Sequence, residues 1–273
     1  MIHIGNQTAF SAASMTEPFD YALAKGFDAF EWFPDKKESG AGWDESDLSE
    51  GARAEIRNAA QAIGMRLSVH VPWTVNPLKP ETAPLLRRQI ELANDLGAAV
   101  LVVHLYTEDG VPTYAQAILE PLEWVAASGL TLAIENTVKT APADFNELFA
   151  ILRSLDPPQL PRAGMCLDIG HANLCAATRN DYLGFLDQLD AAVPIVHLHV
   201  HENWGDADTH LPLFTGPAAF SDAGLHGFVD RMKSHGYSGS IILEQWPNPP
   251  SLLDHARDGL LRMWNDNGDP PVH

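Results

Sequence analysis

Short apolar runs with many β-forming residues alternate along this chain with longer amphipathic stretches. The apolar runs cover residues 2–5, 28–32, 66–70, 99–104, 130–135, 163–168, 195–199 and 240–244. Runs of this length predict β-strands, and the stretches between them predict helices. The alternation therefore predicts eight repeats of a β-strand followed by an α-helix.

The predicted helices end at residues that stop a helix. Residues 81–96 carry apolar side chains at a period near 3.6, which predicts a helix. Gly97 follows directly, and glycine is common just after the end of a helix. The other stops are Gly26, Gly64, Gly129, Pro157, Pro158 and Gly236. No linker divides the repeats, so we predict a single domain over residues 1–273.

The number of repeats and the chain length select the fold class. Eight units with right-handed crossovers close into a barrel, and a (β/α)8 TIM barrel typically has about 250 residues. This chain has 273 residues. We therefore predict an α/β protein with one (β/α)8 TIM barrel, and an open doubly wound sheet is the alternative.

Six of the predicted strands end in a residue that can bind a divalent metal ion. These residues are His70, His104, Glu135, Asp168, His199 and Glu244. One such residue alone is more often structural, but six at one rim are costly to bury unless they pair or bind metal. Since the carboxyl ends of barrel strands meet at one face, we predict a metal site there.

Further candidate ligands follow the last strands. His171 comes just after the strand at 163–168, and Asp208 and His210 lie in the long loop after the strand at 195–199. In that strand imidazole and aliphatic side chains alternate, so His197, His199 and His201 share one face. Only one or two of these three rings need to touch metal, and the others then support the ligands.

The charge of the chain argues against one class of partner. There are 17 basic and 36 acidic side chains, a formal charge of −19, and no segment rich in Lys or Arg. Nucleic-acid binding relies on clustered basic residues, so we do not expect nucleic acid as a partner. The sequence has no signal-like start and no apolar stretch of about 18 residues, so we expect a cytoplasmic protein without a membrane span.

Aromatic residues near the predicted rim are candidate sugar contacts. Trp32, Trp73 and Trp246 end or follow predicted strands on the rim side. An indole face can stack on the C–H face of a sugar, although a tryptophan beside a loop is more often a packing residue. Glu31 is expected either to bind a hydroxyl or to pair with Arg66.

The motifs around these residues resemble one superfamily as a set. The sequence contains Ser68-Val-His-Val-Pro, Val102-Val-His, Ala133-Ile-Glu-Asn-Thr, Cys166-Leu-Asp-Ile-Gly-His, His199-Val-His-Glu-Asn, Asp208-Thr-His-Leu-Pro and Leu243-Glu. In this order they resemble the xylose isomerase-like barrel superfamily over nearly the whole chain. That superfamily includes sugar isomerases and epimerases, inosose dehydratases and apurinic endonucleases of the endonuclease IV type.

The resemblance to the epimerase branch implies one divalent ion, often Mn²⁺, held by Glu135, Asp168, His199 and Glu244. Mg²⁺, Co²⁺ and Zn²⁺ suit such donors as well. The ion would polarise the carbonyl of a sugar, sugar phosphate or related polyol, and Glu135 and Glu244 would pass a proton through an enediolate. His171 would hold a substrate oxygen. The implied function is a metal-dependent isomerase or epimerase.

The resemblance to the endonuclease branch implies up to three zinc ions. It assigns the first to His70, His104 and Glu135, the second to Glu135, Asp168, His199 and Glu244, and the third to His171, Asp208 and His210. Trp73 and Asn76 also resemble residues that follow the first ligand in that branch. The charge argues against DNA, so a phosphodiester hydrolase is the alternative, together with a multinuclear hydrolase or lyase acting on a small molecule.

A noncatalytic function is a further alternative. Such a barrel would keep its metal ligands for stability but lack an accessible pocket. The superfamily resemblance alone also implies a homo-oligomer.

Overall fold

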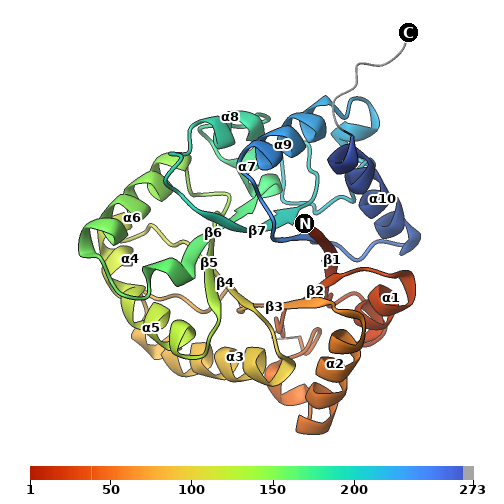
Figure 1. Cartoon of the computed structure of the whole chain (residues 1–273), viewed down its shortest axis with the longest axis horizontal. Helices are drawn as coiled ribbons and strands as arrows, with labels where there is room; N and C mark the ends of the chain where they lie inside the picture. Colours follow the sequence, from red (N-terminus) through yellow and green to blue (C-terminus); the bar gives the residue numbers. More distant parts are fainter. Residues whose placement is uncertain (38, 267–273) are drawn as a thin grey trace.

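Eight parallel strands form a closed barrel in the computed structural model, which describes residues 1–37 and 39–266 (Figure 1). The strands are β1 (His3–Gln7), β2 (Ala29–Trp32), β3 (Arg66–His70), β4 (Val100–His104), β5 (Thr131–Glu135), β6 (Ala163–Asp168), β7 (Ile195–Val200) and β8 (Ser240–Leu243). Each strand pairs with its neighbours in chain order, and β1 also pairs with β8. The predicted (β/α)8 barrel is confirmed, and the open sheet is wrong.

Helices surround the barrel and alternate with its strands (Figure 1). They are α1 (Glu17–Lys25), α2 (Glu50–Ile63), α3 (Ala83–Leu96), α4 (Val111–Ala117), α5 (Leu119–Ala127), α6 (Pro142–Leu155), α7 (Ile169–Leu174), α8 (Tyr182–Asp187), α9 (Ala223–Ser234) and α10 (Ser251–Asn265). Gly26, Gly64 and Gly97 end α1, α2 and α3 in the left-handed conformation, as their sequence positions predict. Within the described part of the chain, no helix is both long and apolar enough to cross a membrane.

Trp32 belongs to the apolar layer between the barrel and the helices. Its side chain is fully buried and packs against Phe19, Phe30 and Trp43, with ring centroids 5.3, 5.1 and 5.6 Å away. Side chains alternate along a strand, so Trp32 faces outward while its neighbour Glu31 faces the barrel interior. Trp32 ends β2, as its sequence position predicts, but its ring is buried against the helices and offers no free face to a sugar in this structure.

Gly5 allows β1 and β2 to approach closely, and this contact can be tested. A Cβ atom at Gly5 would lie 2.2 Å from the backbone oxygen of Ala29, which no side-chain rotation can relieve. We expect Gly5→Ala to lower the free energy of unfolding by about 1–3 kcal/mol in urea titrations. Gly51→Ala is the control, because its Cβ would meet nothing closer than 3.9 Å. A Gly5→Ala variant with wild-type stability would contradict this packing.

Candidate metal centre

The carboxyl end of the barrel gathers the residues that the sequence places at the strand ends. They are His70, His104, Glu135 and Asp168, the last residues of β3 to β6, His199 in β7, and Glu244 directly after β8. The parallel register aligns them, because His104 lies opposite Glu135 and Asp168 lies opposite His199. These side chains therefore share the carboxyl-end rim of the barrel, as their sequence positions predict.

Glu135 lies at the middle of this group. Its Oε2 is 2.7 Å from His70 Nε2 and 3.3 Å from His104 Nε2. Its Oε1 is 3.2 Å from His171 Nδ1 and 3.4 Å from His199 Nδ1. A single buried carboxylate thus contacts four imidazole rings, two with each oxygen.

The residues assigned to one ion by the epimerase resemblance form overlapping groups around Glu135. His199 Nδ1 lies 3.1 Å from Glu244 Oε1. Ligand atoms of His70, Glu135, His199 and Glu244 all lie within 4.8 Å of one another. Ligand atoms of Asp168, Glu135 and His171 also lie within 4.8 Å of one another, and so do those of Asp168, His201 and Glu244. These side chains can therefore converge on a common ion.

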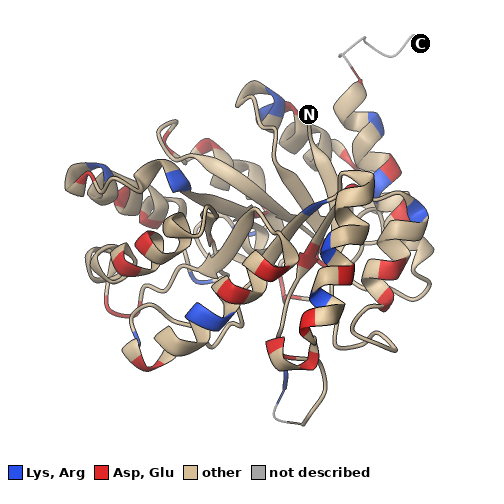
Figure 2. Cartoon of the chain, turned by 60° about the horizontal axis from the view of Figure 1, so that its bottom comes forward, with Lys and Arg blue, Asp and Glu red and all other residues tan. Residues whose placement is uncertain are grey.

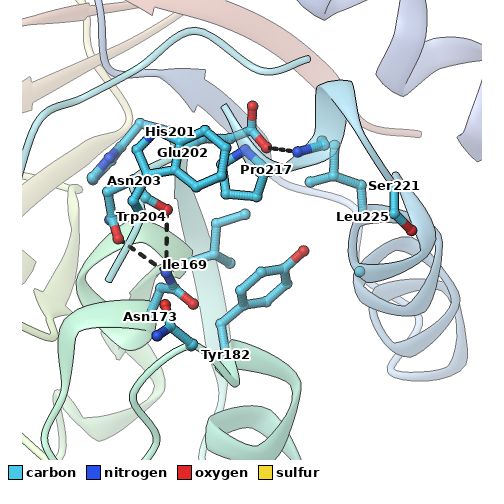
Figure 3. A pocket seen from close by; sticks show the side chains of 13 residues that line it. Ile169, Asn173, Tyr182, His201, Glu202, Asn203, Trp204, Pro217, Ser221 and Leu225 are labelled. Atoms are coloured by element: carbon cyan, nitrogen blue, oxygen red, sulfur yellow. Dashed lines mark hydrogen bonds between the residues drawn. The ribbon is translucent and has the colours of Figure 1, made fainter. Parts of the chain in front are cut away.

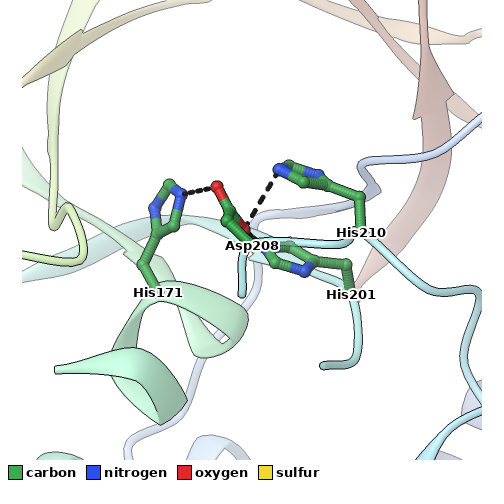
Figure 4. Close-up of side chains that lie close together, drawn as sticks. All are labelled: His171, His201, Asp208 and His210. Atoms are coloured by element: carbon green, nitrogen blue, oxygen red, sulfur yellow. Dashed lines mark hydrogen bonds and ion pairs between the residues drawn. The ribbon is translucent and has the colours of Figure 1, made fainter. Parts of the chain in front are cut away.

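A second cluster lies in the loop after β7 and the first turn of α7 (Figure 4). Asp208 is 3.3 Å from His171 Nε2 through one oxygen and 3.3 Å from His210 Nε2 through the other. His201 joins this cluster, since its fully buried ring stacks on that of His210 at 3.9 Å. His201 Nε2 also lies 3.3 Å from Asp168 Oδ1, so it connects the loop cluster with the strand-end residues.

Three histidines have one ring nitrogen committed to a backbone carbonyl. Nδ1 of His70, His171 and His210 lies 2.7, 2.8 and 2.9 Å from the backbone oxygens of Val71, Asn136 and Glu244. A carbonyl can only accept, so each Nδ1 carries a proton and the Nε2 of the neutral ring has a free lone pair. Those Nε2 atoms face carboxylate oxygens. Metal-binding histidines are held in this way.

Several buried polar atoms at the centre lack a hydrogen-bond partner among the described residues. They include Asp168 Oδ2, Glu244 Oε2 and both ring nitrogens of His199. Unpaired polar atoms are costly in a protein interior. A divalent cation would engage carboxylate oxygens and imidazole nitrogens of this kind. The residues present therefore fit a metal ion.

Asn136 is a positioning residue that the sequence analysis missed. Its side chain donates to the backbone oxygen of Asp168 and accepts from the Asp168 N–H, both at 2.8 Å. Asp168 Oδ1 in turn accepts the backbone N–H of His171 at 2.7 Å, which caps α7. The only sequence signal for Asn136 was its place directly after Glu135. The backbone of β5 and β6 is thus fixed where both supply candidate ligands.

The two carboxyl groups predicted as acid and base differ in their ionisation. Burial opposes ionisation of Glu135, but the neighbouring His199, His104 and His70 outweigh it and lower its pKa well below the usual range. Burial raises the pKa of Glu244 to about 8, opposed by His199 and assisted by the negative charge of Asp168. Two carboxyl groups with separated pKa values are typical of acid–base pairs.

A cavity of about 450 Å³ opens beside the centre. Its lining includes Gln7, Phe33, His210, Glu244 and Trp246. Trp246, predicted as a sugar contact, therefore lies next to a candidate catalytic carboxyl group. A cavity of this size accommodates a sugar-sized molecule.

The other two predicted substrate contacts lie elsewhere. Trp73 is 57% exposed on the rim, in a separate depression that also contains His104. Asn76 is buried, and its side chain donates to Glu108 at 2.7 Å and accepts from the Leu78 N–H at 2.9 Å. Both ends of the Asn76 amide are thus used within the loop, and the substrate contact of Asn76 stays a prediction.

A second cavity, of about 410 Å³, borders the loop that carries Asp208 and His210 (Figure 3). Glu202 lines it and accepts backbone N–H groups of Gly216 at 3.0 Å and Ala218 at 2.7 Å. These bonds close the loop onto the end of β7. Glu202 therefore holds the loop cluster in place.

Glu31 lies inside the barrel below the strand-end residues. It accepts a hydrogen bond from Ser68 Oγ at 2.7 Å and contacts Nε2 of His197 at 3.0 Å and Nε2 of His199 at 2.9 Å. Arg66, its predicted partner, is exposed at the other end of β3. The expectation that Glu31 pairs with Arg66 is therefore wrong, and its contact with a substrate hydroxyl stays a prediction.

A closed β/α barrel with ionisable side chains gathered at the carboxyl ends of its strands has its polar cluster where TIM-barrel enzymes place their active sites. The chain belongs to the xylose isomerase-like TIM barrel family, whose family model matches residues 19–263. The superfamily assignment made from the motifs is thus confirmed.

Individual relatives are more distant. The chain is 28% identical over 203 residues to the uncharacterized protein MJ1311 of Methanocaldococcus jannaschii, covering 66% of this chain and 64% of that protein. It is similar to the structure of a D-tagatose 3-epimerase-like protein, with a TM-score of 0.73, 21% identity and coverage of 96% and 98% of the two chains. An L-ribulose 3-epimerase gives a TM-score of 0.67 at 16% identity, with coverage of 99% and 100%. Identities this low support the fold alone.

Metal binding should release the proton held by Glu244. With its pKa raised to about 8, this group is protonated at neutral pH, whereas a metal ligand must be ionised. We expect affinity for Mn²⁺ or Co²⁺ to rise as the pH approaches 8. Calorimetry in buffers of different ionisation enthalpy should show Glu244→Gln releasing about one proton fewer than wild type. Equal proton release would contradict this assignment.

Proposed function

We propose that this protein is a divalent-metal-dependent isomerase or epimerase of a sugar or sugar phosphate. The observation that carries the proposal is the pair Glu135 and Glu244, which flank His199 Nδ1 at 3.4 and 3.1 Å beside a sugar-sized cavity. A carboxylate can take up a proton from carbon and return it as the acid. The two carboxyl groups therefore suit a proton transfer between two positions of one substrate.

The residues of the chain divide the chemistry among themselves. Glu135, Asp168, His199 and Glu244 would hold the ion, which supplies polarisation of the substrate carbonyl when bound. One of Glu135 and Glu244 removes the proton from the carbon beside that carbonyl, and the other returns a proton. His171, at the edge of the centre, holds a substrate oxygen. Trp246 offers an apolar face to the sugar within the cavity.

The fold is shared with an L-ribulose 3-epimerase and a D-tagatose 3-epimerase-like protein, so it can house epimerase chemistry. An epimerase and an aldose–ketose isomerase share the first proton removal, from the carbon beside the carbonyl. Exchange of the substrate hydrogen with solvent therefore tests both, whichever product forms.

We expect the metal-loaded protein to exchange an α-hydrogen of a ketose or ketose phosphate with deuterated solvent, measured by NMR. Glu135→Gln and Glu244→Gln should each slow the exchange by about 10²–10⁴-fold, because each removes one proton-transfer group. Glu91→Gln, a neutralised carboxylate on the exposed side of α3, should exchange at the wild-type rate. Absence of exchange across a broad ketose panel with Mn²⁺, Co²⁺ and Zn²⁺ would refute the proposal.

A multinuclear hydrolase or lyase is the second candidate function. It is favoured by the loop cluster of His171, Asp208 and His210, because a one-ion isomerase leaves this cluster and the contacts of His70 and His104 with Glu135 unused. Clustered ions can activate water for attack on a small phosphate ester. Metal analysis distinguishes the two candidate functions. One ion per chain favours the isomerase, and two or three ions per chain favour hydrolysis.

DNA fits this centre poorly as a substrate. Acidic residues are spread over the outer helices (Figure 2). Basic side chains around one rim depression are already paired, Lys36 with Asp44 and Asp47, and Arg88 with Glu45. With a formal charge of −19, the surface repels a polyanion.

We therefore expect zinc-loaded protein to leave abasic duplex DNA intact at low salt and in enzyme excess, as seen on a denaturing gel. Low salt favours any electrostatic binding, so the test is weighted against this expectation. Metal-dependent incision would establish the phosphodiester hydrolase instead.

A further inference from the structure

Glu31 is a fully buried carboxylate that takes no direct part in the proposed chemistry. It projects from β2 into the barrel below the metal centre. Its Oε2 accepts from Ser68 Oγ at 2.7 Å and lies 3.0 Å from His197 Nε2. Its Oε1 lies 2.9 Å from His199 Nε2, although the N–H direction of that ring is not aligned with this oxygen.

His199 is oriented differently from three other histidines of the centre. His70, His171 and His210 each direct Nδ1 to a backbone carbonyl and Nε2 toward a carboxylate of the centre. His199 directs Nδ1 toward Glu135 and Glu244, and its other nitrogen meets a side chain, Glu31. Glu31 thus occupies for His199 the place that backbone carbonyls occupy for these three rings.

We propose that Glu31 is a positioning residue, which holds the proton of His199 on Nε2 and presents Nδ1 to the metal ion. The inference rests on the metal centre of the proposed function. A carboxylate behind a ligand histidine fixes its tautomer and orientation and raises its basicity. Ser68 and His197 hold Glu31 in turn, since both contact its other oxygen.

An alternative occupant of this position is a metal ion bound by Glu31 itself. Ligand atoms of Glu31, His197 and His199 lie within 4.8 Å of one another. Two hydrogen-bonding groups already contact Oε2, and Glu31, His197 and His199 are fully closed off from solvent. These features favour a hydrogen-bond network, and the metal stoichiometry decides between the two.

The test is Co²⁺ binding to the full-length protein and to Glu31→Gln, Glu31→Ala and Ser68→Ala. Chelator competition gives the affinity, the visible absorption of bound Co²⁺ reports its ligand geometry, and elemental analysis gives the number of ions. We expect Kd to rise about 10-fold for Glu31→Gln and up to about 100-fold for Glu31→Ala, with altered Co²⁺ spectra and unchanged stoichiometry. Glu91→Gln should match wild type in all three measurements.

Ser68→Ala removes one hydrogen-bond donor to Glu31 but keeps the Glu31 carboxylate beside His199. It should therefore weaken Co²⁺ binding less than Glu31→Ala does. It keeps the proposal testable if the Glu31 variants do not fold. Wild-type affinity and spectrum in the variants that fold would overturn the positioning role while leaving the metal centre intact. Loss of one equivalent of metal in Glu31→Ala would make Glu31 a ligand and overturn it too. No Co²⁺ binding by wild type would overturn both this inference and the proposed metal centre.

Discussion

Burial of the Glu135 carboxylate among imidazole rings is the interaction on which the rest of the centre depends. A lone ionised carboxylate in a protein interior is strongly unfavourable. Here four rings approach its two oxygens at 2.7 to 3.4 Å. Those rings come from β3, β4, β7 and α7. They meet only because the barrel closes, so the fold and the electrostatics of the centre support each other.

Much of this arrangement follows from the sequence because parallel strands align their ends. The apolar runs placed the eight strands to within a few residues, and polar residues at their ends had to share one rim. Which face of a strand points inward was harder to decide. Glu31 and Trp32 are adjacent and both are buried. Only packing against Phe19 and Trp43 shows that Trp32 faces the helices.

Residues whose roles depend on loop conformation could not be predicted in the same way. Asn76 looked available to a substrate, but a turn folds its amide back onto Leu78 and Glu108. His201 was predicted to lie on the same strand face as His199, yet its stacking on His210 needs the loop to return over β7. That return is made by the backbone bridge between Glu202 and Leu211 and by hydrogen bonds from distant N–H groups to the Glu202 carboxylate. Sequence periodicity contains no information about such contacts.

The two oxygens of Glu135 contact different pairs of imidazole rings. Among the described residues, Oε2 contacts the rings of His70 and His104, whereas Oε1 contacts those of His171 and His199. Replacement of His70 or His104 during evolution would therefore remove contacts of Oε2 directly and change those of Oε1 only through the shared carboxylate. A barrel built like this can drift between single-ion and multi-ion chemistry by changes at one or two strand ends. Such modularity offers a physical reason why one fold accommodates both sugar and phosphate-ester chemistries.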